Sequence, residues 1–197
     1  MKILITGATG GLGRSAIDYL KKYVNDNSSN IQIKATGRNE AIGKLITQEN
    51  KQHNIQVEFV ALSLSKASDI ELDKLVKDVD VVWHCAAKSA AWGKYSDFVA
   101  DNVTATKRLL EHSAKQNVKQ FIHVSTPAVY FDYTKNINID ETYKASKFAN
   151  MYASTKWQAE QEVLQASLLF PHLRTAIIRP RAIFGEYDNI LLPYILK

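Results

Sequence analysis

The chain has 197 residues, of which 46% are hydrophobic and 23% charged, and its formal net charge is +5. This is the composition of a globular domain, and it excludes an intrinsically disordered or collagen-like chain. The basic residues are scattered and no apolar run is long enough to span a bilayer, so we expect neither a nucleic-acid partner nor a membrane segment.

Short apolar runs alternate with longer helical patterns along the chain. We predict strands at 2–6, 31–36, 56–60, 79–84, 120–125 and 174–179. We predict helices at 12–23, 40–52, 69–76, 95–116 and 148–170. Because the strands are apolar on both faces and alternate with helices, the sequence predicts an α/β fold. Its expected form is a doubly wound parallel sheet with helices on both faces, the Rossmann arrangement.

Two local patterns add detail to this reading of the elements. Ser68 is followed three residues later by Glu71, which predicts a capping box at the start of the helix at 69–76. The stretch 127–147 is a long irregular connection, and such connections are usually functional or mobile in compact domains.

A glycine-rich turn at residues 6–13 links the first predicted strand to the first predicted helix. Gly7 permits the tight turn, Gly10 lets the backbone approach a pyrophosphate, and Gly13 allows close packing of helix on strand. The amino terminus of the helix would offer N–H groups and a positive dipole end to the phosphates. The residues that we expect to contact a dinucleotide here are Gly7, Thr9, Gly10, Gly11, Leu12 and Gly13.

The end of the second predicted strand decides which dinucleotide is expected. An acidic side chain here would bind the free ribose hydroxyls of NAD, but none precedes Glu40. Gly37 leaves room, and Arg38 offers a guanidinium suited to a 2′-phosphate. We therefore expect NADP as the preferred cofactor, with NAD as the alternative. The other interpretation of Arg38 is an exposed loop residue.

Tyr152 and Lys156 stand four residues apart, which places them on one face of the predicted helix. A neighbouring ammonium lowers the pKa of a phenol, and a phenol tuned in this way can exchange a proton with an alcohol or a carbonyl. Ser125 and Thr126 end the fifth predicted strand, on the edge of the sheet where ligands bind in doubly wound folds. We expect Thr126, Tyr152 and Lys156 to form the catalytic set, and we expect no metal.

Together these motifs resemble the extended short-chain dehydrogenase/reductase superfamily, also described as the NAD(P)-dependent epimerase/dehydratase family. The resemblance runs from residue 7 to residue 185 and includes Asn102, which matches a recurrent helix asparagine. It implies that Thr126, Tyr152 and Lys156 are the catalytic Ser/Thr, Tyr and Lys, and that Tyr152 and Lys156 also contact the cofactor. The further cofactor contacts that it implies are Ser63, Leu64, Ala86, Ala87 and Pro180.

The segments 124–131 and 179–185 look most like the 3β-hydroxysteroid dehydrogenase-like branch. That resemblance implies hydride transfer between a nicotinamide and a secondary alcohol or ketone, on an apolar small-molecule substrate. An epimerase of sugar nucleotides uses the same residues and stays open. Dehydration is disfavoured, because Pro127 follows Thr126 where dehydratases have an acidic residue. A non-catalytic NADP-binding fragment or sensor is the alternative from another class.

The sequence also departs from the family pattern. Ser63 stands where the family usually has an Asp that reaches the adenine. We expect one Rossmann domain over 1–197, with the substrate-binding cap of the family absent or only begun at 186–197. By analogy with the superfamily, a homodimer is expected through the helices near 95–116 and 148–170.

Cys85 is the single cysteine and lies in an apolar run, so we expect a small buried hydrophobic side chain and no internal disulfide. An unpaired thiol suits a reducing compartment, and the chain begins with a short strand pattern that does not resemble a signal peptide. We therefore expect a cytoplasmic protein.

Overall fold

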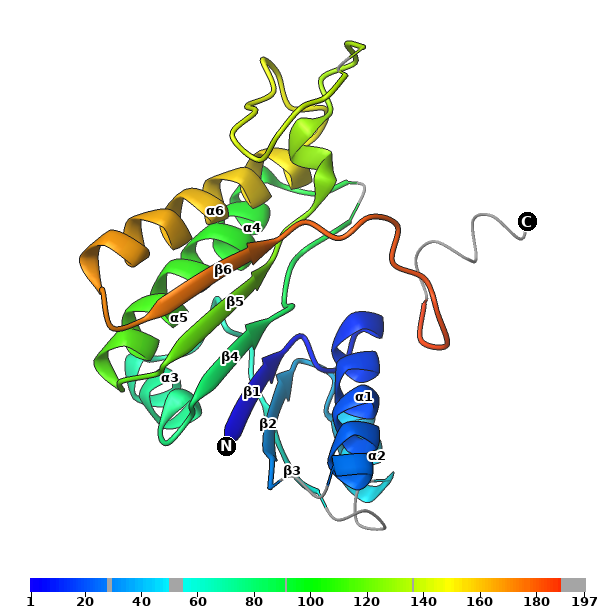
Figure 1. Cartoon of the computed structure of the whole chain (residues 1–197), viewed down its shortest axis with the longest axis vertical. Coiled ribbons are helices and arrows are strands. Elements are labelled where there is room, and N and C mark those ends of the chain that lie inside the picture. Colours follow the sequence, from blue (N-terminus) through cyan, green and yellow to red (C-terminus); the bar gives the residue numbers. More distant parts are fainter. Residues whose placement is uncertain (28–29, 50–54, 91, 136, 189–197) are drawn as a thin grey trace.

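The computed structural model describes residues 1–27, 30–49, 55–90, 92–135 and 137–188. They form a parallel sheet whose strands are ordered β3-β2-β1-β4-β5-β6 (Figure 1). The strands are β1 (Lys2–Thr6), β2 (Gln32–Gly37), β3 (Gln56–Ala61), β4 (Val81–His84), β5 (Gln120–Val124) and β6 (Arg174–Ile178). All six predicted strands are present, within two residues at each end, so this part of the prediction is confirmed.

Helices cover both faces of the sheet, as predicted. One face carries α1 (Gly11–Asn27) and α2 (Glu40–Glu49), and the other carries α3 (Asp69–Val76), α5 (Ala105–Lys115) and α6 (Met151–Leu169) (Figure 1). Alternation along β1 shows the two layers directly. Ile3 and Ile5 belong to the apolar core under α1 and α2, whereas Leu4 belongs to the core under α3, α5 and α6. The doubly wound fold is confirmed.

The segment predicted as one helix over 95–116 is three different helical pieces. α4 (Tyr95–Phe98) leads into a π-helical turn, η2 (Val99–Thr104), and α5 follows. The turn places Asn102 in the interior, where its Oδ1 accepts a hydrogen bond from the Lys88 backbone N–H at 2.7 Å and its Nδ2 donates to the Lys88 carbonyl at 3.1 Å. Single π turns of this kind are frequent at functional sites.

The prediction that the last long helix begins at residue 148 was wrong by three residues. α6 begins at Met151, because the Asn150 side chain accepts a hydrogen bond from the Ala153 N–H at 2.8 Å and caps the helix. The predicted capping box of Ser68 and Glu71 is confirmed at the start of α3. Beyond residue 49, the end predicted for the helix at 40–52 lies outside the described residues.

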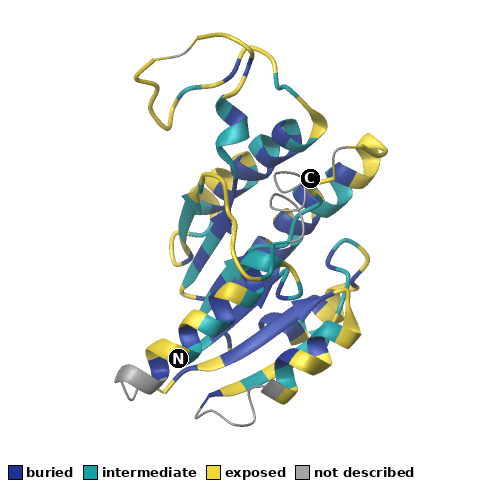
Figure 2. Cartoon of the chain, turned by 90° about the vertical axis from the view of Figure 1, so that its right-hand side faces the viewer, coloured by how far each residue is buried: buried dark blue, intermediate teal, exposed yellow. Residues whose placement is uncertain are grey.

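The irregular connection after β5 begins with a short 3-10 helix, η3 (Pro127–Tyr130), and then projects from the body of the domain (Figure 1). Most of this loop is exposed (Figure 2). Asp132 organises it, since its carboxylate accepts hydrogen bonds from the Thr134 hydroxyl at 2.5 Å and the Tyr143 hydroxyl at 2.7 Å.

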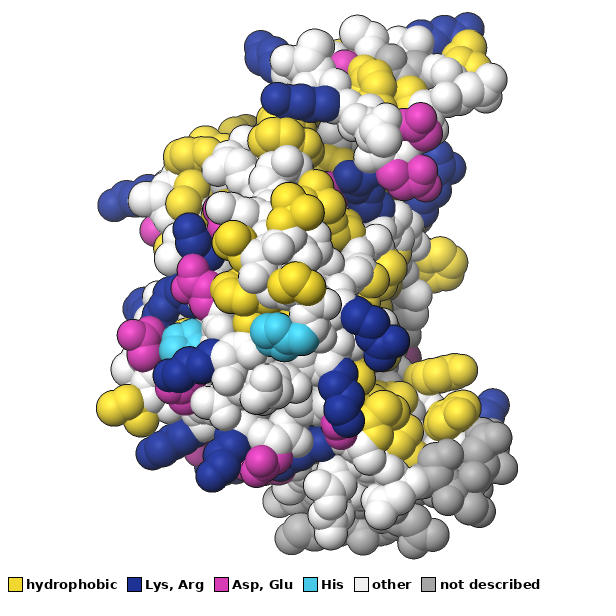
Figure 3. All heavy atoms as spheres, turned by 60° about the vertical axis from the view of Figure 1, so that its left-hand side comes forward, with side chains coloured by type: hydrophobic (Ala, Val, Ile, Leu, Met, Phe, Trp, Pro, Cys, Tyr) yellow, Lys and Arg dark blue, Asp and Glu magenta, His cyan; other side chains and the backbone are white. Residues whose placement is uncertain are grey.

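On the face of the molecule that α3, α5 and α6 form, the charges are scattered as predicted (Figure 3). Figure 3 shows acidic and basic side chains interspersed on the face that α3, α5 and α6 cover. Of the helices that the structure describes, none is long and apolar enough to cross a membrane. α5 packs against α6, and the homodimer expected through this region stays a prediction. Of the segment 186–197, where a cap was expected at most to begin, residues 189–197 lie outside the described residues.

Candidate functional site

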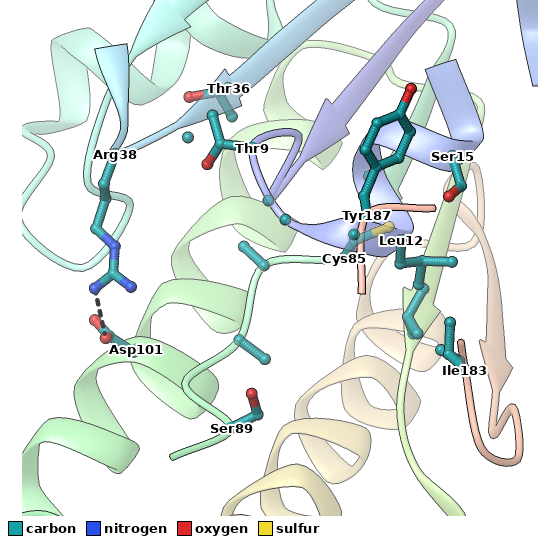
Figure 4. Close-up of a pocket in the computed structure, with 18 of the residues that line it drawn as sticks. Thr9, Leu12, Ser15, Thr36, Arg38, Cys85, Ser89, Asp101, Ile183 and Tyr187 are labelled. Carbon is teal, nitrogen blue, oxygen red and sulfur yellow. Dashed lines mark hydrogen bonds and ion pairs between the residues drawn. The ribbon is translucent and has the colours of Figure 1, made fainter. Parts of the chain in front are cut away.

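A cavity of about 660 Å³ opens at the carboxyl ends of the strands, between the loops that follow β1, β2, β4 and β5. This is the point where the strand order reverses, and ligands bind there in open parallel sheets. Figure 4 shows Arg38 and Asp101 at one end of this cavity and Tyr187 and Ile183 at the other. The predicted site residues that line it are Gly7, Thr9, Gly10, Gly11, Leu12, Gly13, Arg38, Ser63, Leu64, Ala86, Ala87 and Tyr152.

The three motif glycines of the loop after β1 have different structural roles. Gly7 has a φ of +65°, and a Cβ there would lie 2.8 Å from the Ala86 backbone nitrogen. A Cβ on Gly13 would lie 2.4 Å from the Gly7 carbonyl oxygen. A Cβ on Gly10 would meet only that oxygen, at 3.4 Å. Gly7 and Gly13 therefore allow the backbone segments to pack, whereas Gly10 leaves the backbone open toward the cavity.

The amino terminus of α1 points its backbone at the same space. α1 begins at Gly11, and its first turn carries no acidic side chain that would compete for the N–H groups or oppose the helix dipole. An open glycine backbone beside such a helix end fits an anionic pyrophosphate. The residues present thus fit a dinucleotide.

The segment after β6 contributes a wall of the cavity, and sequence reasoning missed the part of this wall at Tyr187. A Cβ on Gly11 would lie 2.8 Å from the Tyr187 carbonyl oxygen, so this segment passes close over the start of α1. The Tyr187 hydroxyl donates to Asp18 Oδ2 at 2.7 Å, and the Arg14 guanidinium lies 3.9 Å from the ring centroid. The hydrogen bond to Asp18 raises the pKa of Tyr187 to about 12. Pro180, predicted as a cofactor contact, is not among the residues that line the cavity; Ala182 and Ile183 are.

Tyr152 lies in the first turn of α6, half-buried at the cavity wall, and the Thr126 hydroxyl at the end of β5 lies close enough to its phenol to favour a lower pKa. Thr126 also accepts a hydrogen bond from the Ala128 N–H at 3.2 Å, which caps η3. Thr126 itself does not line the cavity. The structure therefore brings Thr126 and Tyr152 together as predicted, with Tyr152 as the hydroxyl that faces the cavity.

Lys156 follows one turn later and is buried, with 1% of its surface exposed, behind the cavity wall rather than on it. Its Nζ donates to His123 Nε2 at 3.0 Å, because burial lowers the pKa of His123 and leaves its imidazole neutral. Burial also lowers the pKa of Lys156 itself to about 8, against an opposing effect of Glu160.

The expected lowering of the Tyr152 pKa by Lys156 is not found. Burial raises the pKa of the Tyr152 phenol, and the hydrogen bond from Thr126 opposes that rise. The physical reason is the direction of the ammonium, which is hydrogen-bonded to His123 in the sheet.

Sequence reasoning also missed the carboxylate that stands one turn beyond Lys156. Glu160 is 1% exposed and forms a bidentate pair with Arg179, with distances of 2.9 Å from Nε and 2.5 Å from Nη2. Arg179 also donates to the Tyr130 hydroxyl and, at 3.0 Å, to the Glu141 carbonyl. The spacing of four between Lys156 and Glu160 was the available signal. Nothing in the sequence indicates the Glu160 partner Arg179, which directly follows β6.

Two small side chains complete the cavity. Ser125 has a buried hydroxyl without a hydrogen-bond partner among the described residues, and it lines the cavity. Cys85 lines it too and is only partly buried, so the expectation of a buried small hydrophobic side chain was wrong for its exposure. Burial of its sulfur still raises the thiol pKa to about 12. Within the described residues, no cluster of three or more potential metal ligands is present.

Comparison with known proteins agrees with this geometry. The model of the NAD dependent epimerase/dehydratase family matches residues 3–197. The chain is 36% identical over 193 residues to the uncharacterized protein YbjS of Escherichia coli, covering 98% of this chain and 54% of YbjS. It is 30% identical over 199 residues to the 4-hydroxy-2-methyl-3-oxo-4-farnesyl-3,4-dihydroquinoline-1-oxide ketoreductase of Stigmatella aurantiaca, covering 100% of this chain and 54% of that protein.

Solved structures give the same picture. The UDP-glucuronic acid 4-epimerase of Bacillus cereus, solved in complex with UDP-glucuronic acid and NAD, matches with a TM-score of 0.77 and 26% sequence identity. The match covers 95% of this chain and 59% of the epimerase. The chain thus spans about half the length of the curated relatives it matches.

Proposed function

The chain belongs to the NAD-dependent epimerase/dehydratase family, and from this premise we propose that it is the cofactor-binding and proton-transfer part of a nicotinamide-dependent oxidoreductase. Its proposed substrates are a ketone and the corresponding secondary alcohol on an apolar molecule. The ketoreductase relative, which is named for a substrate that carries a farnesyl chain, supports this choice.

The residues around the cavity would hold the dinucleotide along its length. The glycine loop and the start of α1 would bind the pyrophosphate, since they offer backbone N–H groups without a competing carboxylate. Arg38, at the end of β2, would face the adenosine, and NADP is proposed on that ground. Tyr152 lies on the other side of β1 and would face the nicotinamide. When bound, the nicotinamide supplies or accepts the hydride.

The protein's own part in the reaction is proton transfer and positioning. In the reductive direction the Tyr152 hydroxyl would donate its proton to the substrate oxygen, and in the oxidative direction it would take that proton back. Thr126 would hold the phenol in place by a hydrogen bond, since its hydroxyl lies near that of Tyr152. Lys156 lies one helical turn after Tyr152. If its side chain rotated away from His123, its ammonium would supply a positive charge next to the phenol.

The observation that carries this proposal is the position of the Tyr152–Thr126 pair. It lies at the carboxyl end of β5, and Tyr152 lines the same cavity as the open backbone of Gly10. A proton donor and a phosphate cradle in one cavity are what hydride transfer to a carbonyl requires.

The test uses the complete polypeptide that contains residues 1–197, with NADPH or NADH and a panel of long-chain alkyl ketones, followed at the absorbance of the reduced nicotinamide. Tyr152→Phe should lower kcat by about 10²- to 10⁴-fold, the usual contribution of a positioned acid. Its dissociation constant for the cofactor should stay within about twofold of the wild-type value. Tyr95→Phe is the matched control, because Tyr95 is exposed and lies on α4.

The same preparation tests the rival reaction. The epimerase structure supports interconversion of sugar nucleotides by the same residues, so UDP-glucuronic acid is incubated with the protein and its products are separated. Epimer formation without ketone reduction would replace the proposed reaction by epimerisation. Cofactor binding with neither reaction, or a Tyr152→Phe variant as active as wild type, would overturn the proposed role of Tyr152.

A further inference from the structure

The end of the cavity that lies farthest from Tyr152 carries an ion pair. Arg38 Nη1 lies 3.4 Å from Asp101 Oδ2, and Figure 4 shows the two side chains reaching toward each other from the end of β2 and from the helix opposite. The Arg38 side chain is 70% exposed and that of Asp101 is 22% exposed. The exposed Arg38 side chain therefore has room to change its conformation, whereas the more buried Asp101 side chain has little.

The position of Asp101 is determined by its surroundings. It lies in the π-helical turn η2, next to Asn102, whose side chain is anchored on the Lys88 backbone. Its other carboxylate oxygen, Oδ1, accepts a hydrogen bond from the Ser65 hydroxyl at 2.5 Å. Asp101 therefore presents its charge at a constant place, where it lines both the main cavity and an adjoining hollow of about 590 Å³.

The polar side chains at the end of β2 are engaged elsewhere. Asn39 Oδ1 accepts a hydrogen bond from the Ile42 N–H at 3.1 Å, at the start of α2. Glu40 Oε1 lies 3.1 Å from Lys44 Nζ, within α2. Among the described residues, Asp101 is the carboxylate that lines the cavity on the Arg38 side. Asp101 thus supplies, from η2, the acidic side chain that the end of β2 lacks.

We propose that Asp101, held by Ser65, sets the preference between the 2′-phosphorylated and the unphosphorylated dinucleotide. The inference rests on the proposed function, because it needs a dinucleotide whose adenosine lies at the Arg38 end. A 2′-phosphate carries about −1.5 to −2 charges at pH 7, so it competes with Asp101 for Arg38 and is repelled by the carboxylate. A free 2′-hydroxyl instead can donate a hydrogen bond to Asp101. Arg38 alone favours NADP, and Asp101 shifts the balance toward NAD.

The experiment measures dissociation constants for NADPH and NADH by fluorescence titration of the complete polypeptide at low salt, so that no substrate is needed. Asp101→Asn keeps the size of the side chain and removes its charge. It should raise the ratio of NADPH affinity to NADH affinity by about fivefold, the scale of an exposed to half-buried charge contact. Arg38→Ala should lower the same ratio. A second variant, Asp101→Ala, repeats the test, and the circular dichroism spectrum of each variant checks its fold.

Asp97→Asn is the matched control. Asp97 lines the adjoining hollow, pairs with Lys88 at 3.7 Å and does not line the main cavity. Removal of its charge should leave the affinity ratio within about twofold, because Asp97 pairs with Lys88, whereas Arg38 pairs with Asp101. A ratio that is equal in wild type and in both Asp101 variants would overturn this inference alone. A wild-type protein that binds neither nucleotide would overturn the proposed function, and this inference with it.

Discussion

The two halves of the sheet build their sides of the cavity by different means. On the side of β1, β2 and β3, the loop after β1 faces a ligand mainly with backbone, shaped by Gly7, Gly10 and Gly13, beside the exposed Arg38 side chain, and the strands carry one buried ionisable side chain among the described residues, Lys34. On the side of β4, β5 and β6, ionisable side chains lie in the interior.

Several ionisable side chains are almost completely buried on the side of β4, β5 and β6. His84 and His123 are 0% exposed, and Lys156 and Glu160 are 1% exposed. Each has a partner: His84 bonds Thr6 at 2.7 Å, His123 bonds Lys156, and Glu160 bonds Arg179. A site made of backbone requires that no side chain fills the space beside it, whereas a buried charge requires a hydrogen-bond or ion-pair partner that offsets its loss of hydration. Substitutions in the two halves should therefore destabilise the protein or weaken binding for different physical reasons.

The largest expected effect falls in the charged half, at Glu160. Glu160→Gln keeps the shape of the side chain but leaves the Arg179 guanidinium without its counter-charge. Breaking one partner of a buried pair costs about 3 to 5 kcal/mol of unfolding free energy. Urea unfolding followed by circular dichroism measures this loss. Glu162→Gln is the control on the same helix, because Glu162 faces Lys107 at 3.7 Å near the surface and should cost about 0 to 1 kcal/mol. Equal losses in the two variants would contradict the difference between buried and surface charge.

The next effect tests the backbone half, with two glycines three residues apart. Gly13→Ala would force a Cβ against the Gly7 carbonyl and the Ala8 Cα, neither of which can move aside, and should cost about 1 to 3 kcal/mol. Gly10→Ala meets only one atom at 3.4 Å and should change the stability by less than about 0.5 kcal/mol. Thermal unfolding and NADPH titration are measured on both variants.

The two alanine variants separate packing from binding. We expect Gly10→Ala to stay folded and to bind NADPH at least about tenfold more weakly, because its methyl group occupies the space of the pyrophosphate. A Gly10→Ala variant with unchanged affinity would show that the loop does not hold the phosphates. A stable Gly13→Ala variant would show that the loop can shift, against the contacts described above.

The same contrast explains what the sequence could predict. The glycine loop depends on neighbours in the chain, so the turn between β1 and α1 was predicted, and its role in phosphate binding stays a prediction. The position of Thr126 at the edge of the sheet follows from the end of β5, because parallel strands end at one edge, and its joint role with Tyr152 of α6 stays a prediction. Glu160, Arg179 and His123 were missed as a network, since each comes from a different element and nothing local indicates that they meet.

Smaller misses have the same origin. The π turn at η2 is invisible in a periodicity that reads as one helix over 95–116, because one extra residue in a turn hardly alters the pattern. The approach of Asp101 to Arg38 needs that turn and the parallel order of β2, β1 and β4. The direction of Lys156 toward His123, which removes its effect on the Tyr152 pKa, is a tertiary contact that a spacing of four residues does not contain.

The last prediction concerns the charge of Lys156 and its dependence on pH. The pKa of Lys156 is lowered to about 8 in the folded chain, against about 10.4 in an unfolded one. Between these values the unfolded chain binds more protons, so wild-type stability rises with pH across this window. Below about pH 8 the folded protein bears the full cost of a buried ammonium, on the order of 3 kcal/mol for a shift of this size. Lys156→Met lacks that cost.

The difference in unfolding free energy between Lys156→Met and wild type should therefore favour the variant most below pH 8 and shrink toward pH 10.4. Groups common to both proteins cancel in this difference, and the lost hydrogen bond to His123 adds an offset that varies little over this range. Lys34→Met is the control from the other half of the sheet. The Lys34 Nζ donates to the Lys74 carbonyl at 2.9 Å, and its pKa is also lowered, mainly by burial. Because Lys34 keeps a path to the surface, its variant should show a weaker slope. A difference in unfolding free energy between Lys156→Met and wild type that does not change from pH 7 to pH 10 would contradict this prediction. It would mean that partners of the Lys156 ammonium offset its burial as fully as Arg179 offsets that of Glu160. The two halves of the sheet would then differ in the partners of their buried groups but not in the free-energy cost of burying them.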